Sequence, residues 1–176
     1  MSTLRLFYAL WPSPELAASL AGWAEQARLV SGGRPMRTET LHLTLAFLGP
    51  VDSALADELA AATPARRLTP GDVTLERYGV FSRQRILWAG PAETPPCLQH
   101  AHDDLWQWLS GYGLAPPTQP FRPHVTLLRN ITQSQPPDDP PAALAWRYDR
   151  MVLVASESLT GGSRYRIVAQ SRPLGG

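Results

Sequence analysis

Apolar residues recur along the chain in short runs, and most of these runs have the length and the flanking turn residues of β-strands. The run 4–11 is rich in aromatic and aliphatic residues and ends before a proline. The run 41–49 alternates in the way expected of a strand with one buried face. Strands are expected at 4–11, 40–49, 72–81, 85–91, 121–130, 145–159 and 163–174, with turns at 82–85 and 160–162.

Apolar residues at a spacing of three or four indicate helices in the segments between these runs. Ser13 is placed to cap the first helix, with Pro14 at its first position. Asp52 or Ser53 is placed to cap the second helix. The expected helices are 14–30, 51–63 and 95–113.

The order of these elements predicts the fold class. It reads strand, helix, strand, helix, two strands, helix, and then three strands. Few of these connections could join parallel strands, which need a long crossover between them. We therefore expect an α+β fold with a mostly antiparallel sheet, in one domain that spans residues 1–176.

Composition excludes several classes of protein. Charged residues make up 18% of the chain and the net charge is +1, so a contact with nucleic acid requires a local basic patch. The single cysteine, Cys97, excludes an intrachain disulfide and a cysteine-based metal site. No apolar run is long enough to span a membrane, and the first residues lack the features of a signal peptide. We expect a cytoplasmic monomer that makes no membrane contact.

One short pattern of chemically active residues occurs twice. The sequences HLTL and HVTL begin at His42 and His124, which are 82 positions apart, close to half the chain. This spacing indicates two pseudo-symmetric lobes of mostly antiparallel sheet, with outer helices, around a central cleft. Residues two apart on a strand point to the same face, so each imidazole would lie beside the hydroxyl of Thr44 or Thr126.

Two imidazoles and two hydroxyls in one cleft suit the chemistry of phosphoesters. One imidazole can act as a base while the other acts as an acid, and the threonines can donate to phosphoryl oxygens. A single His-x-Thr on a strand is more often a packed core or edge feature, and it is the second copy that favours catalysis. No metal is expected, because His100 and His102 lie two apart on a helix, on different faces, and are interpreted as surface residues.

The segments HLTLAFLG at 42–49 and RPHVTLLR at 122–129 resemble the twin motifs of the two-histidine (2H) phosphoesterase superfamily. The similarity is greatest to its LigT-like RNA 2′,3′-cyclic phosphodiesterase branch, historically called 2′-5′ RNA ligases. The opening segment 4–16 and the closing segment 153–174 resemble that branch as well. The resemblance implies two α+β lobes around a cleft, hydrolysis without a metal, and no cofactor.

The resemblance also implies roles for individual residues. His42 and His124 would form the acid–base pair, with His42 as the acid. Thr44 and Thr126 would donate hydrogen bonds to the phosphate. Arg129 matches the basic residue that closes the second motif and would contact the phosphate, the alternative being a surface salt bridge.

Aromatic residues near the motifs are candidates for stacking on a base of the RNA. Phe47 follows the first motif and is the first candidate, although packing in the core is an equally good interpretation. Trp11, Tyr8, Pro50 and Tyr165 are weaker candidates for a contact of the same kind.

The expected function is therefore hydrolysis of the 2′,3′-cyclic phosphate of RNA ends or nucleotides to a 2′-phosphomonoester. One alternative is a module that binds such ends without turning them over. Another is the joining of RNA through a 2′-5′ bond as a side activity. Replacing His42 and His124 separates the first two hypotheses, because an enzyme would lose rate while a binding module would lose affinity.

Overall fold

The computed structural model describes residues 2–138, 140–160 and 162–173. The strands are β1 (Thr3–Leu10), β2 (Arg34–Pro35), β3 (Leu43–Asp52), β4 (Arg67–Leu68), β5 (Gly71–Leu75), β6 (Arg77–Phe81), β7 (Ile86–Gly90), β8 (Val125–Arg129), β9 (Leu144–Tyr148), β10 (Val152–Leu159), β11 (Gly162–Gln170) and β12 (Arg172–Pro173). The helices are α1 (Pro14–Ser31), α2 (Ser53–Ala62) and α3 (Pro96–Ser110), with 3-10 turns η1 (Thr38–Thr40) and η2 (Thr63–Ala65).

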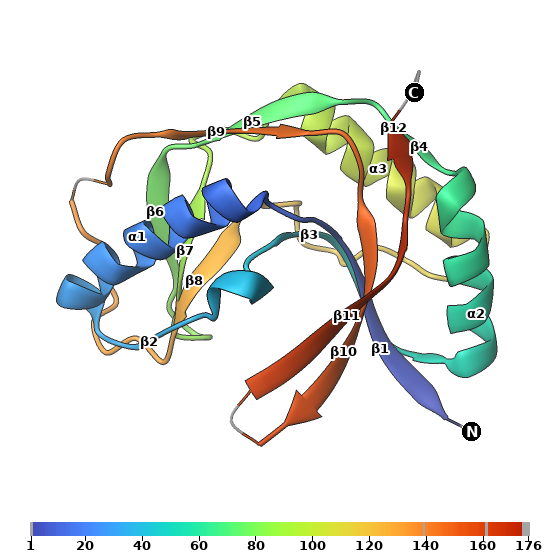
Figure 1. Cartoon of the computed structure of the whole chain (residues 1–176), viewed down its shortest axis with the longest axis horizontal. Coiled ribbons are helices and arrows are strands. Elements are labelled where there is room, and N and C mark those ends of the chain that lie inside the picture. Colours follow the sequence, from blue (N-terminus) through green and yellow to red (C-terminus); the bar gives the residue numbers. More distant parts are fainter. Residues whose placement is uncertain (1, 139, 161, 174–176) are drawn as a thin grey trace.

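One large sheet organises the molecule (Figure 1). Its strands follow the order β11–β10–β1–β3–β8–β7–β6, each antiparallel to its neighbours, and β2 pairs with β8. Two small sheets, β5–β9 and the parallel pair β12–β4, lie off this path. The prediction of an α+β fold with a mostly antiparallel sheet is confirmed.

The two halves of the large sheet correspond to the two expected lobes. The half made of β11, β10, β1 and β3 meets the half made of β8, β7 and β6 where β3 pairs with β8. The pairing there consists of Leu43 opposite Val125. These are the residues between the histidine and the threonine of each motif, so the two motifs meet at the centre of the sheet.

The helices lie on the outside of the strands, with α1 and α2 at opposite ends of the molecule (Figure 1). Helix α1 packs against β8, α2 against β1 and β3, and α3 against β3 and β5. The predicted caps are confirmed, because the Ser13 hydroxyl accepts from the backbone N–H of Leu16 and the Asp52 carboxylate accepts from those of Ala54 and Leu55. No helix within the described ranges is long and apolar enough to cross a membrane.

Two of the expected strands are each divided into two. The run 72–81 forms β5 and β6, which separate at Glu76, whose N–H donates to Gly90 O while its carboxylate accepts from the N–H of Ala92. The run 145–159 forms β9 and β10, which belong to different sheets. Apolar alternation continues across each break, so the sequence pattern did not reveal that the strand changes partner.

The closing segment also differs from the prediction of one strand over 163–174. It forms β11 and β12, separated at Ser171, whose hydroxyl accepts from the N–H of Met151. Leu174 and Gly161, which belong to the expected strand and turn, lie outside the described residues.

Both motif strands begin later than expected. The run 121–130 is a strand only from Val125, because Pro120 and Pro123 lack the N–H that a ladder requires. The run 40–49 is a strand only from Leu43, after the 3-10 turn η1. Each histidine therefore lies one residue before its strand, where its backbone is free of the ladder and its ring can bond to a nearby carbonyl.

The core explains why the motif strands hold their position. Leu43, Leu45, Val125 and Leu127 are at most 3% exposed and belong to one apolar cluster with residues of all three helices. Burying side chains of this size stabilises the fold by about 1.5–3 kcal/mol each. The motif histidines and threonines occupy the alternate positions, which are only partly buried.

Candidate active site

The two histidines are held in the same way by their own backbone. Nδ1 of His42 lies 2.7 Å from the carbonyl oxygen of Thr40, and Nδ1 of His124 lies 2.7 Å from that of Arg122. A carbonyl oxygen only accepts hydrogen bonds, so each Nδ1 carries the proton. The Nε2 of each ring is therefore the nitrogen that can take up or release a proton, which is the orientation an acid–base pair needs.

The carbonyl that holds His42 belongs to a well-anchored segment. The hydroxyl of Thr40 donates to the carbonyl of Arg37, at 2.7 Å. The N–H of Met36 donates to the carbonyl of Leu127 on β8, at 2.9 Å. The segment that orients one motif histidine is thus bonded to the strand that follows the other.

Burial lowers the pKa of both imidazoles, because loss of hydration disfavours the charged form. The pKa of His42 falls from 6.5 to about 4, mainly through burial, with smaller lowering effects from the charges of His124 and Arg129 and a raising effect from the bond to Thr40. The pKa of His124 is also lowered, by burial and by the charge of Arg122, against the bond to the Arg122 carbonyl. Both rings are neutral at pH 7 in the free protein.

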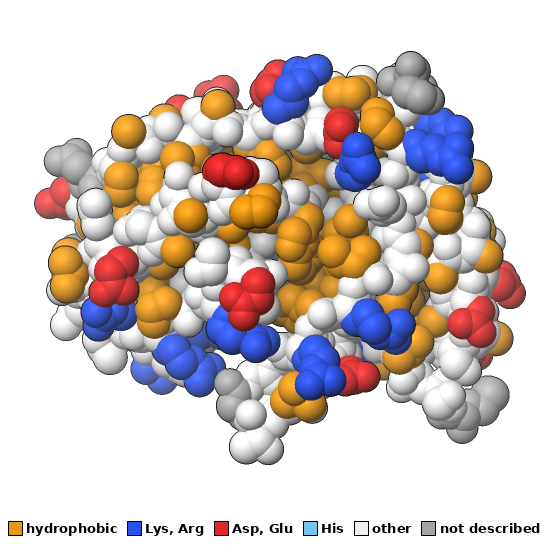
Figure 2. All heavy atoms as spheres, in the orientation of Figure 1, with side chains coloured by type: hydrophobic (Ala, Val, Ile, Leu, Met, Phe, Trp, Pro, Cys, Tyr) orange, Lys and Arg blue, Asp and Glu red, His pale blue; other side chains and the backbone are white. Residues whose placement is uncertain are grey.

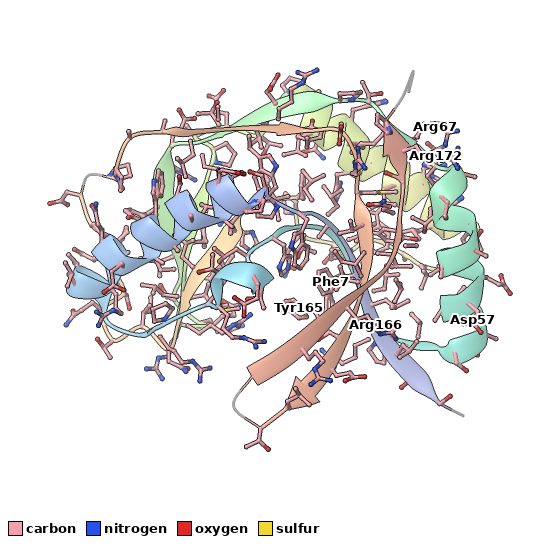
Figure 3. The ribbon with its side chains drawn as sticks, in the orientation of Figure 1. Phe7, Asp57, Arg67, Tyr165, Arg166 and Arg172 are labelled. Carbon is pink, nitrogen blue, oxygen red and sulfur yellow. The ribbon has the colours of Figure 1, made fainter. Side chains whose placement is uncertain are left out.

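Aromatic rings enclose His42. Phe7 stacks on one side with ring centres 4.8 Å apart, and Trp11 lies nearly parallel to the imidazole at 5.2 Å. Tyr165 meets the imidazole edge-on at 5.5 Å. Figure 3 shows Phe7 on β1 and Tyr165 on β11 directed toward the same space between the strands. These contacts desolvate the ring and fix its plane.

Aromatic rings also contact His124, but fewer of them than contact His42. Phe81 approaches it edge-on at 4.9 Å, and Trp88 lies 5.9 Å away. Trp88 in turn covers Gly79 on the neighbouring strand, where an added Cβ would overlap the indole ring. Because fewer rings contact His124, it is desolvated less completely than His42.

A β-bulge in each motif strand determines which later residues face the histidines. In β3, Ala9 pairs with Thr44 and Tyr8 with Ala46, so Leu45 is an extra residue. The extra residue shifts the alternation, and Phe47 therefore falls on the same face as Thr44. Without it, Phe47 would point to the opposite face.

The same device occurs in the second motif strand. In β8, Trp88 pairs with Thr126 and Leu87 with Leu128, so Leu127 is the extra residue. The shift places Arg129 on the face of Thr126. Leu45 and Leu127 are the leucines that follow the threonine in the two motifs.

One cavity of about 350 Å³ collects these side chains. It is bordered by both motif histidines, both motif threonines, Arg129 and Phe47. The other residues around it are Arg5, Phe7, Met36, Thr40, Ile86, Ser156, Ser158, Ser163 and Tyr165. Two imidazoles, several hydroxyls and two arginines around one space can bind a phosphoryl group and move protons to and from its oxygens.

A wider apolar cavity of about 680 Å³ adjoins the first and shares Thr44, Phe47 and His124 with it. Phe81 and Phe121 contribute further aromatic surface. A cavity that presents aromatic faces beside a phosphate site suits a nucleobase, which stacks on such rings.

Comparison with known proteins places this arrangement in a family. Residues 12–157 match the sequence profile of the 2′-5′ RNA ligase superfamily. The chain belongs to this superfamily. It is 33% identical over 164 residues to the RNA 2′,3′-cyclic phosphodiesterase of Escherichia coli, covering 92% of each chain. It is 31% identical over 176 residues to the RNA 2′,3′-cyclic phosphodiesterase of Thermus thermophilus, covering 94% of this chain and 88% of that one.

Solved structures agree with the sequence comparison. A phosphoesterase crystal structure superposes with a TM-score of 0.86 at 28% identity, covering 96% of this chain and 97% of the other. The structure of Escherichia coli LigT complexed with 3′-AMP superposes with a TM-score of 0.85 at 28% identity and the same coverage. The resemblance to LigT-like 2H phosphoesterases is confirmed.

The structure brings together all six residues that the sequence singled out. His42, His124, Thr44, Thr126, Arg129 and Phe47 border the cavity of about 350 Å³. The alternative of core packing is wrong for Phe47, which is 58% exposed, with the guanidinium of Arg5 5.7 Å from its ring centre. Arg129 pairs with no carboxylate in the described part of the chain.

Of the four weaker candidates for stacking on a base, two lie at the site and two do not. Trp11 and Tyr165 contact His42, as described above. Tyr8 is fully buried on the other face of β1, where its hydroxyl bonds to that of Thr63 at 2.8 Å. Pro50 is exposed and lies outside both cavities.

The two histidines of α3, His100 and His102, differ in their surroundings. His100 is exposed, as expected. His102 is not a simple surface residue, because its ring stacks on Phe121 at 4.1 Å and borders the apolar cavity. In the ranges that the structure describes, no three His, Cys, Asp or Glu side chains cluster as a metal site would require.

Sequence analysis missed several residues of the site. Phe7 was overlooked because it lies in an apolar run that reads as buried, although its position two before Ala9 and four before Trp11 places it on the histidine face. Ser156, Ser158 and Ser163 come from the β10–β11 hairpin, which the resemblance covered as a segment without giving these serines a role.

Proposed function

We propose that the protein hydrolyses 2′,3′-cyclic phosphates of RNA ends or nucleotides to 2′-phosphomonoesters. One observation carries the proposal: two histidines, each with its Nδ1 proton bound by a carbonyl, line one cavity together with both motif threonines. The names of the relatives support the choice of substrate.

The reaction follows from these positions. One imidazole takes a proton from a water molecule as the water oxygen forms a bond to phosphorus. The P–O3′ bond breaks, and the second imidazole gives its proton to the departing O3′, leaving a phosphate on O2′. By family resemblance His124 is the base and His42 the acid. Thr44, Thr126 and Arg129 donate to the phosphoryl oxygens that gain negative charge.

The proposal also covers the oligomeric state and the cellular location of the protein. It acts as a monomer, in one bilobal domain over residues 1–176 whose two motifs meet where β3 pairs with β8. A cytoplasmic location is part of the same proposal, since RNA ends are produced there.

The test is hydrolysis of 2′,3′-cyclic AMP by the purified protein in the presence of EDTA. The expected product is 2′-AMP, identified by its separation from 3′-AMP on chromatography. No turnover, turnover that begins only when a metal is added, or release of 3′-AMP would each contradict the proposal. Tight retention of the cyclic nucleotide without any product would instead favour the binding module.

Ligation is tested with the same material. An oligonucleotide with a free 5′-hydroxyl is added to one ending in 2′,3′-cyclic phosphate, and a longer product is sought. We expect hydrolysis to exceed joining at every acceptor concentration, because water is present in far larger amount than the 5′-hydroxyl. Joining that exceeds hydrolysis would make ligation the main activity.

A further inference from the structure

A groove of about 400 Å³ opens next to the catalytic cavity and shares no lining residue with the apolar cavity. It lies between the β2 segment and the β10–β11 hairpin. The groove and the catalytic cavity share Met36, Thr40, Arg129, Ser158, Ser163 and Tyr165. The two spaces therefore share a wall along these residues, which places the groove beside any ligand held at the histidines.

The groove is basic. Arg34, Arg37 and Arg129 line it, and among the described residues no carboxylate does. Arg34 lies directly opposite Arg129 where β2 pairs with β8, and both side chains are exposed. Like charges at directly opposite positions destabilise a sheet, so an arrangement that keeps them together indicates an anionic ligand.

Two of the groove arginines have no carboxylate partner, as is the case for most arginines of the described residues. Arg28, Arg66, Arg147 and Arg150 each make an ion pair with a carboxylate at 3.1 Å or less. Within the described ranges Arg34 and Arg129 make none. Arg37 lies 4.0 Å from Glu39 and donates to the carbonyl of Ser163, so it also fixes the hairpin that forms the far wall.

Arginine side chains gather on the surface near the groove. Figure 2 shows Lys and Arg side chains, with a few Asp and Glu side chains among them, along the lower edge of the face, from the end of β2 to the β10–β11 hairpin. The chain contains no lysine, so all of these charges are guanidinium groups. Guanidinium binds phosphate through two parallel hydrogen bonds, which an ammonium group cannot do.

We propose that this groove binds the phosphate backbone of RNA adjoining the cyclic end, so that an oligonucleotide is a better substrate than a mononucleotide. The inference rests on the proposed function and extends it to the rest of the substrate. The catalytic pair lies between two unlike surfaces, an aromatic cavity that suits a base and a basic groove that suits phosphates. Arg129 lies where the groove joins the catalytic cavity, and Arg34 lies one step further along it.

The experiment compares two substrates at several salt concentrations. One is 2′,3′-cyclic CMP, and the other is an eight-nucleotide RNA that ends in 2′,3′-cyclic phosphate. We expect the oligonucleotide to have the higher kcat/KM and the steeper decrease with salt, since each neutralised phosphate of a single strand adds about 0.7 to the salt slope.

The variant is Arg34→Ala, which leaves the catalytic residues in place. We expect it to lower kcat/KM for the oligonucleotide about tenfold, as loss of a hydrogen bond to a charged group does, and to reduce the salt slope by about 0.7. Its kcat/KM for 2′,3′-cyclic CMP should be unchanged. Arg34→Glu should lower the oligonucleotide value further. The matched control is Arg147→Ala, an exposed arginine of β9 paired with Asp72, which should alter neither substrate.

Three results would overturn the inference. They are equal kcat/KM of the wild type for both substrates, an equal loss on both substrates in Arg34→Ala, and the same loss in Arg147→Ala. If the wild type hydrolyses neither substrate, the proposed function fails, and the groove is tested by binding alone. In that case the fluorescence anisotropy of an eight-nucleotide RNA with a 2′-phosphate end must still show weaker binding to Arg34→Ala than to Arg147→Ala.

Discussion

Phe47 and Arg129 occupy equivalent places in the two halves of the sheet. Each lies three residues after the threonine of its motif, and each reaches the histidine face because the intervening leucine is an extra residue in the ladder. In regular strands both side chains would point toward the opposite face. The bulges therefore give the catalytic cavity one aromatic side chain and one cationic side chain at corresponding positions.

Replacing Phe47 by alanine should affect substrate binding much more than stability. The ring is 58% exposed, so the free energy of unfolding should change by at most about 0.5 kcal/mol. KM for a cyclic nucleotide should rise because a stacking surface is lost. Urea denaturation and steady-state kinetics measure the two effects. The neighbouring Leu45→Ala, at a position only 3% exposed, is the contrasting variant and should destabilise the fold by about 2–5 kcal/mol. A loss of stability in Phe47→Ala comparable to that of Leu45→Ala would contradict this account.

Replacing either motif histidine by asparagine should remove most of the catalytic rate. We expect kcat to fall by about 10²–10⁴ in His42→Asn and in His124→Asn, with little change in affinity for the product nucleotide. Since the rings act as a unit, the double variant should be hardly slower than the slower single variant. The control is His100→Asn on α3, whose side chain is exposed and outside both cavities. Losses that simply multiply in the double variant would argue against a coupled pair.

The pH dependence of kcat/KM should be bell-shaped, with its maximum below pH 6.5. The base must be deprotonated and the acid protonated, and kcat/KM reports both groups in the free enzyme. The pKa values of both rings are lowered there, that of His42 to about 4, so the mixed protonation state is most populated in acid.

The profile of kcat alone should lie at higher pH. A bound phosphate favours the charged form of both imidazoles and raises their pKa values in the complex. Replacing the acid should flatten the alkaline limb of the remaining activity, and replacing the base the acidic limb. A maximum of kcat/KM above pH 7 would contradict the lowered pKa values of the free enzyme, and a rate that rises steadily with pH would exclude the two-histidine mechanism.

His42 should also make the stability of the fold depend on pH. Its pKa is about 4 in the folded protein and 6.5 in the unfolded chain, so between these values the unfolded chain binds more protons. The contribution to stability is complete above pH 6.5 and is lost progressively as the pH falls toward 4. Urea denaturation at pH 7.5 and pH 5 should show a smaller loss of stability in His42→Asn than in the wild type. His100→Asn should behave like the wild type, and an identical pH dependence in all three proteins would contradict the assigned pKa.

Local sequence determined much of this protein. Ser13 and Asp52 cap their helices as predicted, because an N-cap bond depends only on residues within one turn. The alternation of His42 and Thr44 with buried leucines fixed which side chains share a face at the start of each motif strand. The second copy of the pattern, together with the resemblance it carries, indicated the acid–base pair and its phosphate donors.

Pairing between distant strands decided the rest. The position of Phe47 depends on an extra residue at Leu45, and the extra residue exists only relative to the register of β1. The breaks at Glu76 and near Arg150 likewise mark where a strand changes partner, while the apolar pattern continues unchanged. Tyr165 and Arg34 reach the site from a closing hairpin and a two-residue strand, brought there by contacts with β10 and β8. Alternation in a sequence reports which positions are buried, but register is a property of two strands together, and only the folded chain brings them into contact.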